Sequence, residues 1–146
     1  MIVKRLLVLL IASLGVACDN TVSGPSGTDT SGTTATATPI SESFEATLSH
    51  GESAFYSFNV VTAGVTTVTL ASVVDPRKAA PLAMPMRIAL GMPVGEGCEI
   101  GDAVETPPAL TPQLTATLAS GIHCVWVGDS GQLTGTVIVS IRFVHR

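Results

Sequence analysis

Apolar and polar residues alternate along most of the chain after residue 40, and this period of two constrains the fold more than any other feature. The run from Ser43 to Leu48 reads Ser-Phe-Glu-Ala-Thr-Leu, and the run from Phe55 to Val60 reads Phe-Tyr-Ser-Phe-Asn-Val. Successive side chains of a strand point to opposite faces, so such runs are typical of strands that bury one face. The many threonines and valines suit the same pleated surfaces.

Further alternating runs predict more strands. They lie at Val68–Leu70, Met86–Leu90, Leu114–Leu118, Ile122–Val127 and Thr136–Val144, the last with Val137, Val139, Ile141 and Phe143 on one face. Prolines predict a loop over 73–85 and a long irregular loop over 93–112, because proline cannot donate to a strand ladder. About seven to eight strands and no convincing helix predict an all-β fold, a single antiparallel β-sandwich over residues 40–146.

The first 17 residues predict a cleavable secretion signal. Lys4 and Arg5 precede an apolar run, Leu6–Val16, that is too short to span a bilayer comfortably. Small residues close the run directly before Cys18. The alternatives are a membrane anchor or a buried helix, but the polar stretch that follows at once favours the signal.

The junction Leu14-Gly15-Val16-Ala17-Cys18 resembles the cleavage site of bacterial lipoproteins. The resemblance implies that Cys18 receives diacylglycerol and becomes the mature N-terminus. The family prefers leucine three residues before the cysteine, where this chain has Gly15. Ordinary signal cleavage near Ala17, which would release a soluble protein, is the alternative.

Residues 18–39 predict a lipidated cysteine followed by a disordered tether. The segment from Asp19 to Pro39 is rich in Thr, Ser and Gly, and Val22 is its only large apolar residue. A segment with so little apolar surface cannot offset the entropy of ordering its backbone.

The three cysteines predict one disulfide. An exported protein meets an oxidising compartment, and if Cys18 carries lipid, Cys98 and Cys124 remain to pair with each other. Closing that loop would stabilise the fold by roughly 3 kcal/mol. Two cysteines without nearby partner ligands do not complete a zinc tetrahedron, so no metal site is expected.

The charge balance argues against a nucleic-acid partner. Removing Lys4 and Arg5 with the signal leaves five Lys and Arg against 11 Asp and Glu, a side-chain charge of −6. Binding nucleic acid requires basic patches.

Glycine and apolar positions recur at fixed spacings through residues 42–144. The motifs are Phe44-x-x-x-Leu48, Gly51-x-x-x-Phe55-Tyr56-Ser57-Phe58-Asn59-Val60, Gly64-x-x-x-Val68-x-Leu70, Gly121-x-x-x-Val125-x-Val127 and Val137-x-Val139. This pattern resembles the pre-peptidase C-terminal type of β-sandwich domain. The resemblance implies a jelly-roll-like fold that assists substrate contact, secretion or folding in exported proteins, and some relatives bind calcium or polymeric substrates. The 146 residues include no peptidase domain, and no functional residue of the family carries over.

No catalytic constellation is predicted. His50, His123 and His145 fall in a turn, a strand and the C-terminus, and no local nucleophile signature accompanies them. His123 is in phase with Val125, which predicts a buried or half-buried structural histidine.

An acidic cluster and the single tryptophan are the remaining candidate binding residues. Glu96, Glu99, Asp102 and Glu105 cluster in the predicted loop 93–112, but their spacing matches no compact calcium loop, which favours a solvated acidic loop. Trp126 is out of phase with Val125 and Val127, so it is predicted to point outward on the face of Cys124. There it is expected to pack over the Cys98–Cys124 bridge, and contact with a sugar ring or a partner is the alternative.

Together these expectations describe an exported lipoprotein, anchored to the cell membrane or outer membrane, that displays a non-enzymatic binding or structural module. No cofactor is expected. Its partners would be the membrane, through the lipid, and an unidentified envelope protein or polysaccharide. The alternative is an accessory or inhibitor of an exported peptidase or polysaccharide-acting hydrolase.

Overall fold

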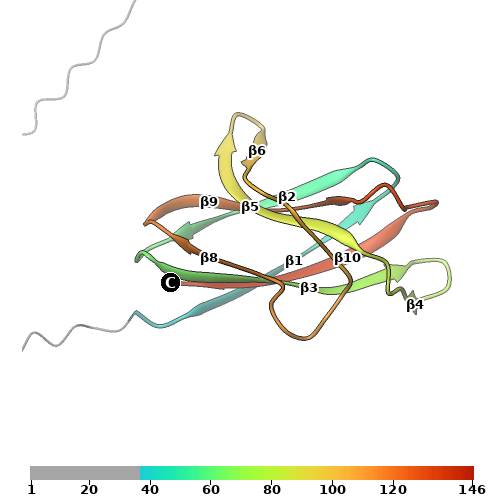
Figure 1. Ribbon diagram of the computed structural model, residues 1–146, viewed down its shortest axis with the longest axis horizontal. Coiled ribbons are helices and arrows are strands. Elements are labelled where there is room, and N and C mark those ends of the chain that lie inside the picture. Colours follow the sequence, from blue (N-terminus) through green and yellow to red (C-terminus); the bar gives the residue numbers. More distant parts are fainter. Residues whose placement is uncertain (1–36) are drawn as a thin grey trace, which may run out of the picture. The chain divides into compact units, whose positions relative to one another are not determined.

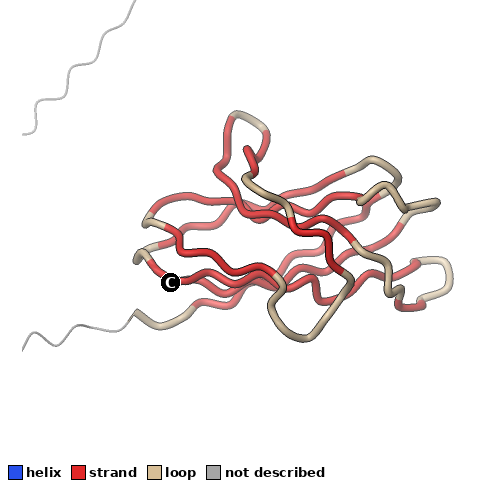
Figure 2. Tube along the Cα trace, in the orientation of Figure 1, coloured by secondary structure: helices blue, strands red, loops and turns tan. Residues whose placement is uncertain are grey.

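The computed structural model describes residues 37–146, which form ten strands and no helix (Figures 1 and 2). The strands are β1 (Ile40–Leu48), β2 (Ser53–Val60), β3 (Gly64–Asp75), β4 (Ala80–Pro81), β5 (Met86–Val94), β6 (Gly97–Ile100), β7 (Val104–Thr106), β8 (Leu114–Leu118), β9 (Gly121–Asp129) and β10 (Val137–His145). Within this range no helix could cross a membrane. The predicted signal, Cys18 and all but residues 37–39 of the predicted tether lie outside the described residues.

The strands form two antiparallel sheets packed face to face. One sheet has the order β1-β10-β3, with β4 and β8 both paired to β3. The other has the order β2-β9-β5, with β6 and β7 both paired to β5. The chain therefore passes between the sheets from β1 to β2 and back from β9 to β10, which is the connectivity of a jelly roll. The predicted antiparallel, jelly-roll-like β-sandwich is confirmed.

The core lies between the sheets and consists of the residues whose alternation predicted it. Val137, Val139, Ile141 and Phe143 of β10 are buried, as expected for one face of that strand. Ile88 of β5 and Val125 and Val127 of β9 meet them from the other sheet; the remaining buried members are Leu48, Phe58, Val60, Val68, Leu70, Val73, Met86 and Leu133. Burying a side chain of this size contributes about 1.5–3 kcal/mol, so this row holds the sheets together.

Aromatic rings close the sandwich where the edge strands β1 and β2 lie side by side. The ring of Tyr56 stacks on Phe44 and lies tilted against Phe143, with centroids 5.8 Å apart in both pairs. Its hydroxyl donates to Oε2 of Glu42 at 3.2 Å, and this hydrogen bond and the charge of Glu42 raise the pKa of Tyr56. The partly exposed ring of Tyr56 thus covers the core at this edge of the sandwich.

The prediction of a loop over residues 73–85 is wrong for its first three residues, which belong to a strand. Strand β3 continues to Asp75, and Val73 is completely buried in the core. Pro76 lies beyond the end of β3, and Pro81 belongs to the two-residue strand β4 at the edge of its sheet. A proline at an edge breaks no ladder hydrogen bond with a second neighbour, so both prolines are compatible with strands here.

The prediction of a long irregular loop over residues 93–112 is wrong for its first half, which consists mostly of strands. Strand β5 continues through Pro93 to Val94, and β6 and β7 follow as short strands paired to β5. Pairing between β5 and β9 ends at Gly91, so Pro93 has a neighbouring strand on one side only. Residues 107–113 are irregular, and the backbone N–H groups of Ala109 and Gln113 donate to carbonyls of β3.

Candidate functional site

The predicted disulfide is present and crosses the outer face of the sheet that contains β9. Cys98 on β6 and Cys124 on β9 are joined, with their Cα atoms 6.1 Å apart. The bridge passes over β5 at Gly91, which is paired with Cys124 on one side and with Ile100 on the other. A Cβ at Gly91 would lie 3.0 Å from Sγ of Cys98, so the crossing needs a residue without a side chain.

Trp126 points away from the core, as its phase predicts. Its cross-strand neighbours are Phe55 on β2 and Ala89 on β5, and none of the three belongs to the core between the sheets. The six-membered ring of the indole lies over Gly128, where a Cβ would come within 2.2 Å of Cη2. The indole thus extends along β9 toward Gly128, whereas Cys124 is on the other side of Trp126 along the strand.

These residues form a second apolar cluster outside the core. We call it the outer-face cluster and define it as Phe55, Ala89, Trp126 and the Cys98–Cys124 bridge. Ala89 and Cys124 are completely buried although they face outward, whereas Trp126 is half-buried and Phe55 is 38% exposed. On this face Ala89 and Cys124 are covered, whereas the rings of Phe55 and Trp126 are partly exposed to solvent. Exposed aromatic rings on a sheet face are suited to contact another molecule.

Polar residues border the outer-face cluster. Ser57 lies opposite Cys124 on β2, and Arg87 lies opposite Glu105 across β5 and β7. Oε1 of Glu105 accepts a hydrogen bond from the side chain of Gln132 at 3.3 Å. An aromatic centre with a polar border has the composition of a protein contact surface.

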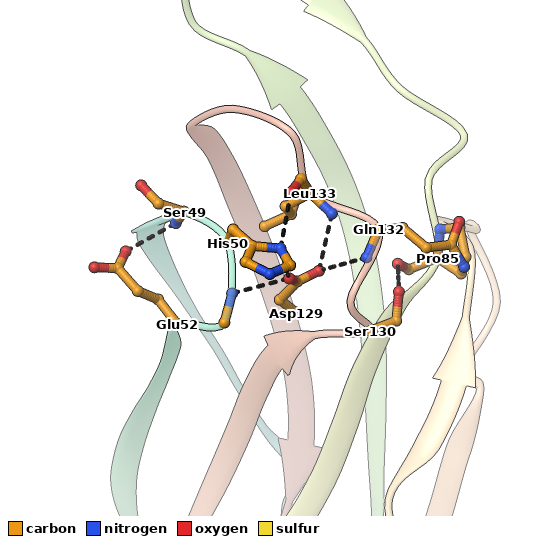
Figure 3. Close-up of polar contacts among 9 residues, drawn as sticks. Ser49, His50, Glu52, Pro85, Asp129, Ser130, Gln132 and Leu133 are labelled. Atoms are coloured by element: carbon orange, nitrogen blue, oxygen red, sulfur yellow. Dashed lines mark hydrogen bonds and ion pairs between the residues drawn. The ribbon is translucent and has the colours of Figure 1, made fainter.

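A carboxylate organises the turns at one end of the sandwich (Figure 3). The Asp129 side chain is 1% exposed. Its Oδ2 accepts a hydrogen bond from the backbone N–H of Gly51 at 2.9 Å, and its Oδ1 accepts from Gln132 and Leu133 at 3.1 Å each. Burial raises the pKa of this carboxyl, but the backbone N–H donors outweigh burial and the net pKa is lowered. Asp129 therefore joins the β1–β2 turn to the β9–β10 connection.

His50 lies beside Asp129 at the same end of the sandwich. Its Nδ1 is 3.0 Å from the carbonyl oxygen of Leu133 and 3.3 Å from Oδ2 of Asp129, and its side chain is 72% exposed. The nearby serines have other partners: the Ser130 hydroxyl donates to the Pro85 carbonyl at 2.9 Å, and the Ser49 hydroxyl lies 3.2 Å from that of Thr136. Nucleophilic catalysis needs a hydroxyl directed at the free imidazole nitrogen.

The other two histidines also have structural partners. Nε2 of His123 lies 2.9 Å from the Ala119 carbonyl oxygen, and the ring is half-buried beside Phe58, as its phase predicts. His145 is 1% exposed, and its Nε2 lies 2.8 Å from Oε1 of Glu42. The rings of His123 and His145 both lie against Phe58, with centroids 6.2 Å and 4.9 Å from its ring, whereas His50 contacts Leu133 and Asp129.

The four acids of the segment 96–105 lie in four different places along β6, β7 and the turns beside them. Glu96 lies in the β5–β6 turn, Glu99 on β6, Asp102 between β6 and β7, and Glu105 on β7. Within residues 37–146, no three His, Cys, Asp or Glu side chains converge in a way that could hold a metal ion. A pocket of about 100 Å³ opens elsewhere, beside Asp75 and residues 134–137.

Two residues of these sites were missed from the sequence, although each had a signal. Phe55 is the aromatic residue of its strand that is out of phase with Tyr56 and Phe58, which marks it as outward-facing. Asp129 begins the run Asp-Ser-Gly, and an aspartate at that place in a turn commonly accepts hydrogen bonds from the following backbone N–H groups.

Comparisons with known proteins assign this chain to no family. No protein-family model matches the chain, and no curated protein sequence matches it either. Among solved structures it aligns with a chain from the one described as "Bacillus endospore appendages form a novel family of disulfide-linked pili". The two chains are 10% identical with a TM-score of 0.36, over 74% of this chain and 88% of that chain. A TM-score this low supports no argument about the present protein, whose fold class rests on its own strand pairing.

Proposed function

We propose that the protein is a non-enzymatic binding module of the cell envelope and that the outer-face cluster is its contact surface. The observation that carries this proposal is the pair of outward aromatic rings, Phe55 and Trp126, on a sheet face held by a disulfide. Rigid aromatic side chains give up little conformational entropy on binding and are enriched at contact surfaces. The partner is another envelope component, a protein or a polysaccharide.

Two further parts of the proposal concern location and family. A disulfide is typical of proteins outside reducing compartments, which supports export. With the signal-like N-terminus, it supports lipidation at Cys18 and anchoring of the domain to a membrane. The jelly-roll connectivity is compatible with the pre-peptidase C-terminal type of domain that the motifs resemble.

The contact surface is tested by recovering partners of the full lipidated protein from cross-linked envelope extracts. We expect Phe55→Ser to reduce recovery of the partners seen with the parent protein, because Phe55 is the more exposed ring. Leu110→Ser is the matched control, since Leu110 is 90% exposed in the irregular segment 107–113. Equal recovery by the parent and Phe55→Ser would refute the assignment of the surface.

The anchor is tested separately by replacing Cys18 with serine and fractionating the cells. Loss of the diacylglycerol site should move the protein from the membrane fraction to the soluble exported fraction. A variant that stays in the membrane as strongly as the parent would show that lipidation at Cys18 is wrong.

A further inference from the structure

The hairpin of β5 and β6 extends beyond the rest of its sheet. β5 pairs with β9 only as far as Gly91, and its last three residues pair with β6 alone. Figure 1 shows this hairpin, in yellow, projecting from the body of the sandwich. The bridge between Cys98 and Cys124 ties the projecting strand to the central strand β9. The hairpin is therefore held in place while remaining open to solvent.

Two apolar side chains of the hairpin are exposed. Met92 is 60% and Val94 is 58% exposed, and both lie on the face of β5 that carries Ile88 and Leu90 toward the core. The apolar row of β5 thus continues outward past the opposite sheet. In the part of the chain that the structure describes, more than half of each of these two residues is open to solvent.

The same hairpin and the segment after it carry acids without cationic neighbours. Glu96, Glu99 and Asp102 are exposed, and no ion pair joins any of them to a Lys or Arg within residues 37–146. Glu105 differs, because Arg87 lies opposite it on β5. The surface of the hairpin is therefore both apolar and anionic.

The outer edge of β6 presents free main-chain groups. Residues opposite each other in an antiparallel pair alternate between hydrogen-bonded and non-hydrogen-bonded pairs. The Gly101 N–H donates to the Leu90 carbonyl, and Pro93, opposite Cys98, has no N–H to donate. Cys98 and Ile100 are therefore in the non-hydrogen-bonded pairs, and their N–H and C=O groups point away from β5. Among the strands of residues 37–146, β6 pairs only with β5.

We propose that the edge of β6 binds an extended segment of a partner protein in which basic and apolar residues alternate. The main-chain groups of Cys98 and Ile100 would pair with the added strand, as in other cases of strand addition to a sheet edge. A Lys or Arg of the segment would lie opposite Glu99, and opposite charges across a strand pair attract. A second copy of this hairpin would bring the same acids to the junction, so repulsion disfavours it as the occupant.

The test uses two labelled synthetic peptides, Lys-Val-Lys-Val-Lys-Val-Lys-Val and Glu-Val-Glu-Val-Glu-Val-Glu-Val, titrated with the protein while fluorescence anisotropy is followed. We expect saturable binding of the Lys-Val peptide that weakens as ionic strength rises, and no binding of the Glu-Val peptide. Glu99→Gln should weaken binding roughly two- to five-fold, the effect of losing one cross-strand charge pair.

Ile100→Pro tests the edge itself. The N–H that this proline removes points away from β5, so the β5–β6 hydrogen bonds are retained while strand addition is blocked. We expect loss of saturable binding by Ile100→Pro with the Cys98–Cys124 bridge intact, and unchanged binding by Leu110→Ser.

Three outcomes would overturn the proposal: no binding of the Lys-Val peptide, equal binding of the Glu-Val peptide, or unchanged affinity in both Ile100→Pro and Glu99→Gln. Because Phe55 lies on the outer-face cluster and Ile100 on the β6 edge, the peptide result and the envelope recovery described above can fail independently.

Discussion

Asp129 is the residue at which the turns of one end of the sandwich meet. Besides the hydrogen bonds to its carboxylate, its own backbone N–H donates to the Glu52 carbonyl at 3.0 Å. Asp129→Asn removes the charge from a nearly inaccessible group that accepts several N–H donors. Hydrogen bonds to charged groups contribute about 1.5–3 kcal/mol, so we expect a fall of about that size in the free energy of unfolding at neutral pH, measured by denaturant titration.

The lowered pKa of Asp129 also predicts how this difference depends on pH. A carboxyl whose pKa is lower in the folded than in the unfolded state stabilises the fold above the unfolded pKa, about 3.9. That stability is lost as the pH falls through the folded pKa. The gap between the parent and Asp129→Asn should therefore shrink on acidification below about pH 4. Asp102→Asn, an exposed control, should show no such gap; a gap independent of pH would contradict the assigned charge.

Gly128 matters because the indole of Trp126 lies against it. A Cβ there would overlap Cζ2 and Cη2 of the ring, so Gly128→Ala should push the indole outward rather than distort the strand. Because the chain has one tryptophan, its emission reports this directly. We expect a red shift of the emission maximum, easier quenching by iodide and a stability loss of about 1 kcal/mol. Gly135→Ala, where a Cβ meets nothing within 4 Å, should leave the emission unchanged.

At the scale of the strand, alternation was a sufficient signal wherever one face of the strand meets the core. It identified the long strands of both sheets and placed Trp126 outside, because a period of two assigns each side chain to a face. It failed for β6 and β7, which are short edge strands of four and three residues with little apolar alternation. Proline predicts the end of a strand there, but Pro93 breaks no ladder hydrogen bond because one side of β5 has no neighbouring strand at that position.

Gly91 determines whether β6 can pair with β5 at all. A Cβ at this position would lie 2.2 Å from the Glu99 carbonyl oxygen, a backbone atom that cannot swing aside. Gly91→Ala should therefore displace β6 and hinder formation of the nearby disulfide. We expect a raised fraction of free Cys98 and Cys124 thiols in mass spectra of non-reduced digests of exported protein. Gly97→Ala is the control, because its Cβ would lie 3.6 Å from its nearest neighbour, the Val94 carbonyl; equal thiol content in the two variants would argue against this role.

At the scale of the whole molecule, the apolar core holds the two sheets together, whereas the disulfide joins β6 to β9 within one sheet. The core residues lie between the sheets, whereas the bridge lies on the outer face and closes a loop of 26 residues. The pairing could be inferred from the cysteine count once Cys18 had another use, but the route of the bridge across Gly91 depends on a strand that the sequence did not reveal.

Removing the bridge should consequently weaken the domain without changing its fold. For Cys98→Ala combined with Cys124→Ala, released loop entropy predicts a loss of about 3 kcal/mol in the free energy of unfolding. For a domain of this size that corresponds to a fall in Tm on the order of 10 °C. Thermal unfolding followed by circular dichroism measures both quantities, and the spectrum below the transition should remain that of the parent β-sandwich. Adding a reductant should lower the Tm of the parent toward that of the double variant and leave the variant unchanged. If the double variant instead lost its β spectrum at low temperature, the core between the sheets would be insufficient to hold the jelly roll alone.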